Sequence, residues 1–286
     1  MKTWRQRFPV EVMGRLFRVS RGGFYDWPTR GPSARAQEDE RLKVTIRAAH
    51  GRSREACGDR RLQPELAAGG FVAGRDRIGR LRRGMGLRCR QKRRFKATTN
   101  SSHNLPVAGN LPGQQFSPTA PDQVWVTDLA CIPTGEGWLC LAGIKDVFTC
   151  EIAGHAVGER RTQEPTALAL VRAVRLKRPP AGRIHHSGLG SRYCAHDYRA
   201  LVAQFGLRAS MSRKDNCYGN APMESFWGSL RNGLVHHRRF ATRAGAKAAI
   251  QECTGIFYSR QRRHSRPGNL PPAVFAQRFS RLAAAA

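Results

Sequence analysis

The chain has 286 residues and carries 50 lysines and arginines against 20 aspartates and glutamates, a formal charge of +30 that points to a polyanionic partner. No apolar run reaches the roughly 18 residues of a membrane-spanning helix, and the first residues lack the apolar centre of a signal peptide, so we expect no membrane association. Because the positive charge is mostly arginine and is spread along the chain, we expect nucleic acid to be the partner and the location to be cytoplasmic, on the nucleoid.

The first hundred residues are the most basic part of the chain, with 26 lysines and arginines against 9 acids. Within residues 1–30, apolar side chains recur at helical spacing, Ser20 can cap a second helix and Pro28 can stop it. This pattern predicts an N-terminal helix-turn-helix segment. The apolar positions of its first helix are Val12, Met13, Leu16 and Phe17.

A second helix-turn-helix-like domain is predicted over residues 35–95. Leu62 and Leu66 precede a Gly69–Gly70 break, after which Ile78 begins another helical apolar pattern. The polar side of that last helix is rich in arginine and would meet phosphates and base edges as a recognition helix. A small helical bundle with a solvated basic face is the alternative. The candidate DNA-binding residues are Arg75, Arg77, Arg80, Arg82 and Arg83.

Residues 96–120 are rich in Pro, Gly, Asn and Ser without a period, which predicts a linker. From residue 121 to residue 282 the pattern changes to three consecutive strands with hairpin turns, followed by strands that alternate with helices. This order predicts an α/β fold with a mixed sheet and helices packed on it. The last helix of the pattern is expected over 244–258, followed by the basic block 260–265.

The eight cysteines never form a C-x-x-C pair and most lie in apolar segments, so we expect reduced, packed thiols. The doublets His185–His186 and His236–His237 have no cysteine pair to join them, so structural zinc is not expected. Packing in the core is one interpretation of His185 and His186. Orienting a ligand or contacting phosphate is the other.

Two acids stand out in the second half. Asp128 lies inside an apolar strand, where a charge is costly unless a cation or hydrogen bonds compensate it. Glu224 lies in the first turn of a helix that Asn220 would cap and that has Pro222 near its start. Taken singly, each has a structural interpretation as well as a functional one.

Taken together, four blocks resemble the OrfB-type transposases of bacterial insertion sequences, which are relatives of retroviral integrases. The blocks are "QVWVTDLACIPTGEGWLCLAGIKDVFT", "IHHSGLGSRY", "MSRKDNCYGNAPMESFWGSLRNGLVHHRRF" and "FYSRQRRHSRPGNLPPAVFA", and the N-terminal helix-turn-helix segments also match. The resemblance covers nearly the whole chain. It implies an RNase H-like catalytic core, DNA cleavage and strand transfer at element ends, element-end and target DNA as partners, a homo-oligomer on DNA, and in some elements a subunit from an upstream frame.

The resemblance also implies a site in which two aspartates and a glutamate bind two Mg²⁺ or Mn²⁺ ions, with thirty-five residues between the last two acids. Asp128 corresponds to the first aspartate, which bridges the ions, and Glu224 to the glutamate. The second aspartate falls at Gly188, and the spacing to Glu224 confirms this alignment. The family's basic loop corresponds to Arg213 and Lys214, which would contact DNA ends or form a solvated charge run.

Three other acids are candidates to replace the missing ligand. If the hairpin centres near Gly135, Asp146 lies opposite residue 124 on the same face as Asp128, at ~13 Å, which is too far to share an ion. Asp197 and Asp215 are better explained as helix-starting or solvated acids. The expected function is therefore a transposase impaired at Gly188. The alternatives are a catalytically inactive DNA-binding remnant, a regulator of transposition, or a plain sequence-specific DNA-binding regulator.

Overall fold

The computed structural model describes residues 1–90, 105–113, 116–213 and 220–285. It divides into two compact units, Met1–Ile46 and Arg47–Ala286. Among the described residues no helix is long and apolar enough to cross a membrane. Residues 96–104 and 114–115 of the predicted linker 96–120 fall outside the described residues, and the predicted domain boundaries stay predictions.

The first unit contains a short 3-10 turn, Lys2–Trp4, and the helices α1 (Val10–Phe17) and α2 (Arg21–Asp26). The Ser20 hydroxyl accepts a hydrogen bond from the Gly23 amide at 3.0 Å, so the predicted N-cap of the second helix is confirmed. Helix α3 (Ala34–Arg52) begins in this unit.

The second unit begins with the end of α3 and continues with α4 (Asp59–Ala68) and α5 (Arg75–Gly84), whose apolar sides are buried as their spacing predicted. A five-stranded sheet follows, made of β1 (Val124–Thr134), β2 (Gly137–Asp146), β3 (Ile152–Gly158), β4 (Ile184–Ser187) and β5 (Arg208–Met211). Its strand order is β3-β2-β1-β4-β5. The first three strands are antiparallel, whereas β4 and β5 run parallel to β1.

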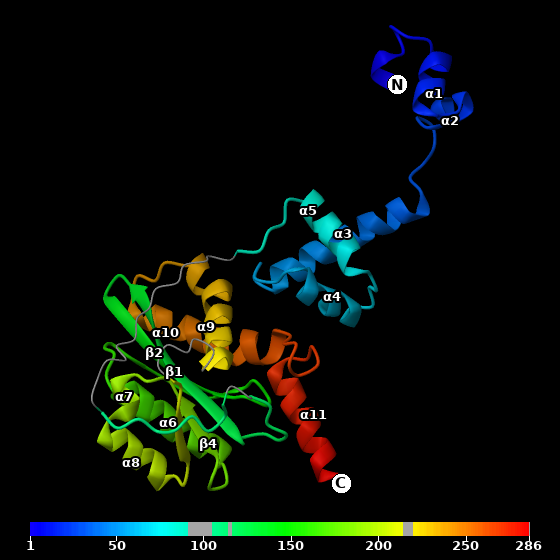
Figure 1. The fold of residues 1–286 in the computed structure, drawn as a ribbon. Helices are drawn as coiled ribbons and strands as arrows, with labels where there is room; N and C mark the ends of the chain where they lie inside the picture. Colours follow the sequence, from blue (N-terminus) through cyan, green and yellow to red (C-terminus); the bar gives the residue numbers. More distant parts are fainter. Residues whose placement is uncertain (91–104, 114–115, 214–219, 286) are drawn as a thin grey trace. The chain divides into compact units, whose positions relative to one another are not determined.

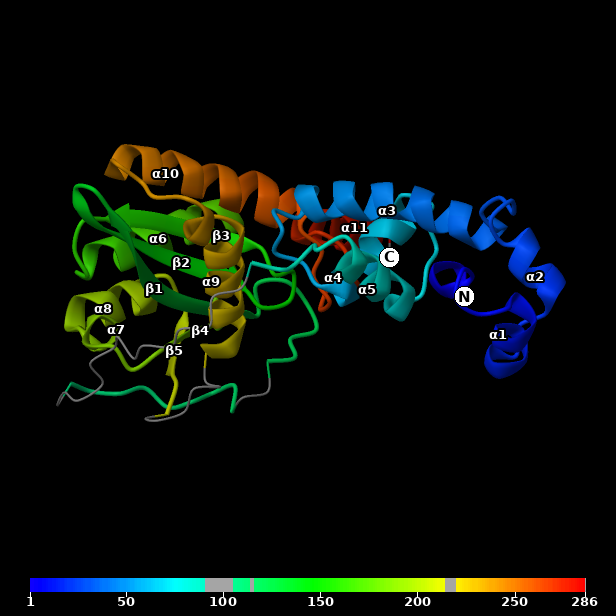
Figure 2. The same cartoon turned by 90° about the horizontal axis from the view of Figure 1, so that it is seen from above.

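Helices cover both faces of the sheet (Figures 1 and 2). One face packs against α6 (Glu164–Lys177), α7 (Ser191–Cys194) and α8 (His196–Gln204). The other packs against α9 (Ala221–Gly233), α10 (Arg243–Glu252) and the π-helical segment η4 (Cys253–Gln261). The remaining described helices are the 3-10 turn Val235–His237 and α11 (Pro272–Ala284). The predicted mixed α/β sheet is confirmed.

The helix expected over 244–258 changes its winding part-way, because α10 ends at Glu252 and η4 continues as a π-helix. Phe257 and Tyr258 in this π-helical segment are both buried. Apolar spacing alone did not reveal this change.

The expectation of reduced thiols was wrong for one pair, because Cys131 and Cys140 form a disulfide. These residues lie directly opposite each other on the antiparallel strands β1 and β2, with their Cα atoms 4.0 Å apart. Among the described residues five other cysteines are free: Cys57, Cys89, Cys150, Cys194 and Cys253. Cys217 lies outside the described residues.

Candidate active site

The candidate site lies where β1, β4 and the start of α9 meet. Asp128 follows four buried residues of β1, and its carboxylate faces α9, where Trp227 Nε1 donates a hydrogen bond to Asp128 Oδ2 at 3.0 Å. Glu224 lies one helical turn before Trp227 and is exposed. Helix α9 therefore carries both the second acid of the site and the donor that orients the first.

Two side chains fix the start of α9 to the sheet. Lys145 on β2 is buried, and its Nζ donates to the Pro222 carbonyl at 2.9 Å. Asn220 occupies the N-cap position, but its side chain does not cap the helix, contrary to the prediction. Its Nδ2 atom instead donates a hydrogen bond to the Thr127 carbonyl at 2.9 Å. Because Thr127 precedes Asp128, this contact joins the two acid-bearing elements directly.

A glycine permits the close approach of α9. Gly143 lies opposite Asp128 on β2, and a Cβ added there would lie 2.6 Å from Met223 Cε. A larger side chain at this position would require the buried Met223 side chain to move.

Gly188 lies beside Asp128 with space for a side chain. The last parallel pair of β1 and β4 is Thr127 with Ser187, so Gly188 is the next residue along, level with Asp128. Neighbouring strands lie about 4.8 Å apart, and residues level across a pair share a face. A Cβ at Gly188 would meet nothing within 4 Å, and its backbone is outside the left-handed region. An acid at this position would therefore point into the same site as Asp128.

The electrostatics show two carboxylates that repel each other. Burial raises the pKa of Asp128, against the lowering effects of the Trp227 hydrogen bond and of the Arg192 and Arg231 cations. Partial desolvation of its carboxyl group, and then the negative charge of Asp128, raise the pKa of Glu224. Such a pair is stabilised by a cation bound between its members. Among the described residues no group of three or more acidic, histidine or cysteine side chains can hold a metal ion.

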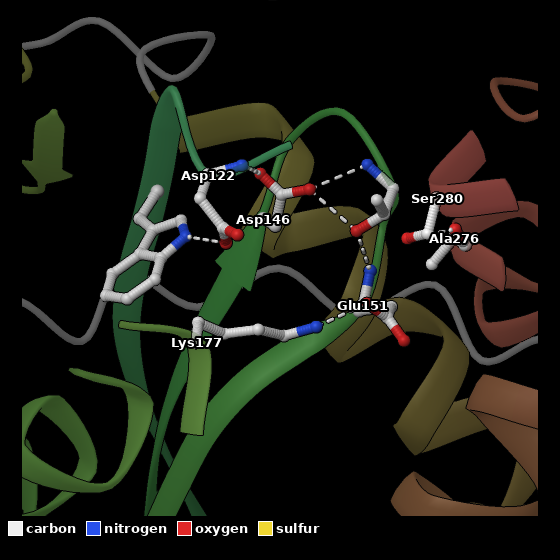
Figure 3. Close-up of polar contacts among 8 residues, drawn as sticks. Asp122, Asp146, Glu151, Lys177, Ala276 and Ser280 are labelled. Atoms are coloured by element: carbon white, nitrogen blue, oxygen red, sulfur yellow. Dashed lines mark hydrogen bonds and ion pairs between the residues drawn. The ribbon is translucent and has the colours of Figure 1, made fainter. Parts of the chain in front are cut away.

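Asp146 does not belong to this site, and the expected register was wrong by one residue. Asp146 pairs with Trp125, because the turn of the hairpin falls after Thr134. A shift of one residue reverses the face, so Asp146 lies on the face opposite to Asp128. Its carboxylate accepts hydrogen bonds from the Asp122 amide and from the amide and hydroxyl of Thr149 (Figure 3). This acid has a structural role.

The comparisons with known proteins agree with the fold and the order of its domains. A family model described as "Integrase core domain" matches residues 118–217, and one described as "HTH-like domain" matches residues 37–95. The chain is 59% identical over 272 residues to an uncharacterized 31 kDa protein of insertion element IS600 from Shigella sonnei. The matched region spans 95% of this chain and 100% of that protein. It is 35% identical over 270 residues to the transposase InsF for insertion sequence IS3A of Escherichia coli (strain K12), covering 94% of each. The chain belongs to the insertion-sequence transposases of the IS3 type.

Solved integrases are more distant from this transposase. The catalytic core domain of HTLV-2 integrase, solved in complex with magnesium, is 13% identical and covers 56% of this chain and 99% of its own length, with a TM-score of 0.43. The RNase H-like integrase fold follows from the family model together with the mixed five-stranded sheet. Membership of the family makes this fold a polynucleotidyl-transferase core with a helix-turn-helix-like domain before it.

The predicted DNA-binding arginines of the transposase differ in their surroundings. Arg75, Arg80 and Arg83 are exposed on α5. Arg82 is half-buried and pairs with Asp59 at 3.2 Å, and it also donates to the Cys57 carbonyl at 3.2 Å. Arg82 therefore stabilises the packing of α5 against α4. Arg77 is also half-buried, so the exposed three are the better candidates for phosphate contact.

The remaining predicted residues of the transposase are placed as follows. Arg213 is exposed after β5, whereas Lys214 and Asp215 lie outside the described residues. Asp197 is exposed in the first turn of α8 beside His196. His185 is buried against the Tyr198 hydroxyl at 2.8 Å, and burial lowers its pKa to about 3, so it is neutral and packed in the core.

Sequence reasoning missed Trp227, the residue that holds the Asp128 carboxylate. The available signal was its position, one helical turn after Glu224 and therefore on the same side of α9. An indole N–H is a donor only, so a buried tryptophan next to a site acid has a natural acceptor there.

Proposed function

We propose that this protein is an insertion-sequence transposase whose three-carboxylate centre has lost its second acid. Its chemistry would be DNA cleavage and strand transfer, and the chain as it stands would be impaired in both. The observation that carries this proposal is Gly188, which lies level with Asp128 in the parallel pair and offers no side-chain oxygen. The other two positions of the centre, Asp128 and Glu224, are held toward each other by α9.

The residues present fit a divalent metal only in part. Asp128 and Glu224 offer hard carboxylate oxygens of the kind that Mg²⁺ and Mn²⁺ prefer, and their mutual repulsion favours a bound cation. Divalent ions held by a complete set of these carboxylates would supply activation of the attacking hydroxyl and stabilisation of the leaving oxygen. A complete two-ion centre needs the ligand that Gly188 lacks, so we derive no catalytic step for the native chain.

DNA is the partner of this centre in our proposal, in the form of element ends and a target. The formal charge of +30 and the exposed Arg75, Arg80 and Arg83 on α5 support it, and Arg213 adds a cation close to β5. Assembly as a homo-oligomer on DNA, a subunit from an upstream frame and a cytoplasmic, nucleoid-associated location belong to the same proposal.

A second candidate function is a DNA-binding regulator of transposition without catalysis. Gly188 favours it, because the helix-turn-helix-like domain matches its family while the centre lacks a ligand. Such a chain would occupy element ends and reduce strand transfer by an active relative on the same DNA.

The test is a strand-transfer assay with labelled element-end DNA and Mn²⁺, comparing the native chain with Asp128→Asn. We expect both to react at the background rate, since the native centre is already incomplete and loss of one member of a catalytic unit commonly costs ~10⁴-fold. Robust turnover by the native chain that disappears in Asp128→Asn contradicts the proposal, because another oxygen would then fill the vacant position.

A further inference from the structure

A cavity of about 700 Å³ lies between the segment from α3 to α4 and the segment from η4 to α11, and none of its lining residues belongs to the candidate active site. Its size is in the range of pockets that hold a nucleotide-sized group. Six arginines line this arginine cavity, and Glu65 is the one acid among its lining residues: Arg52, Arg61, Arg260, Arg262, Arg263 and Arg278.

The single acid does not balance these charges. Glu65 pairs with Arg52 at 3.4 Å and with Arg263 at 2.9 Å, so its carboxylate is shared between two guanidinium groups. In the described part of the chain, Arg61, Arg260 and Arg278 form no ion pair. All three are exposed at the cavity and are available to an anion.

Arg262 is the most unusual member of the group because it is buried, with 5% of its surface exposed. Its Nε atom has no hydrogen-bond partner among the described residues, and one of its terminal nitrogens lies 3.7 Å from Cys57 Sγ. A buried guanidinium without a carboxylate is destabilising unless an anion compensates it. Burial and the neighbouring Arg61 lower the pKa of Arg262, as expected for an uncompensated cation.

We propose that the arginine cavity binds phosphate groups of a DNA strand, as a second DNA contact outside the catalytic centre. Guanidinium groups bind phosphate through paired N–H donors, and several of them around one cavity match the repeated charges of a nucleic acid backbone. The proposal gives the basic block 260–265 a role in DNA binding, because Arg262 and Arg263 of this block line the arginine cavity. The inference rests on the proposed function only in taking DNA as the partner.

The test measures binding of the full chain to a labelled duplex as a function of salt. The double variant Arg260→Gln/Arg278→Gln should reduce the slope of log K against log[salt] by about two, one for each phosphate contact. The matched control is Arg175→Gln/Arg281→Gln, which removes two exposed arginines outside the cavity and should leave the slope unchanged. Equal slopes for the two double variants overturn the inference.

A buried-site variant adds a second readout. Arg262→Met should bind DNA more weakly while its unfolding midpoint stays the same or rises, because it removes an uncompensated buried cation. Inorganic phosphate should raise the unfolding midpoint of the native chain and not that of Arg262→Met.

A lower stability of Arg262→Met with unchanged DNA affinity would show that Arg262 has a structural role. A response to phosphate without a change in the salt slopes of DNA binding would show a site for small anions. Either result contradicts the proposal. Because both readouts are binding or stability, an inactive centre in the strand-transfer assay does not affect them.

Discussion

Gly188→Asp should restore strand transfer by about 10⁴-fold or more over the native chain, because the three carboxylates of such a centre act as a unit. The structure accepts the new side chain without rearrangement. A Cβ at Gly188 meets nothing within 4 Å, the backbone suits an L-residue, and the parallel register puts the carboxylate level with Asp128. The Trp227 and Asn220 contacts already hold the other two acids in position.

The assay is transfer of labelled element-end DNA with Mn²⁺, and its controls separate a completed centre from added charge. Gly31→Asp makes the same substitution in open space and outside the second unit, so it should stay at the background rate. Glu224→Gln in the Gly188→Asp chain should abolish the restored activity. An inactive Gly188→Asp chain that still binds DNA would contradict the claim that the centre lacks only one ligand.

DNA affinity should fall by about 10³-fold between 50 and 200 mM salt, the second large effect that we expect. The physical reason is counterion release: a chain with +30 formal charge that makes roughly six or more phosphate contacts displaces that many bound cations. The measurement is fluorescence anisotropy with duplexes of unrelated sequence, which should show nearly the same salt dependence. Affinity that barely changes over this range argues against a backbone-dominated interface.

The sequence predicted what local pattern controls. The pattern of residues 121–282 predicted three consecutive strands followed by strands that alternate with helices, and the proline and asparagine before Glu224 predicted the start of α9. The charge of Asp128 raises the pKa of Glu224, so the two acids on these elements are close enough to repel, while their catalytic roles stay predictions. The roles of Gly188 and of the DNA-binding residues stay predictions.

What the sequence did not predict depends on register and on contacts between distant segments. A hairpin turn displaced by one residue moved Asp146 to the other face, and the same register brought Cys131 and Cys140 together. The contacts of Arg54 with Glu252 at 2.6 Å, and of Arg263 with Glu65, join segments almost two hundred residues apart. No local pattern encodes such pairs, so the arginine cavity between those segments could be found only in the structure.

Calorimetric titration with Mn²⁺ tests the central claim most directly, because it measures the ligand set of the centre without DNA or turnover. The account predicts weak binding to the native chain, and binding tighter by on the order of 10-fold or more in Gly188→Asp, since an added carboxylate raises the number and charge of the ligands. Asp128→Asn in the Gly188→Asp chain should remove the gain. Equally tight binding by the native and Gly188→Asp chains would contradict the account, because the position at Gly188 would then not be a vacant metal ligand.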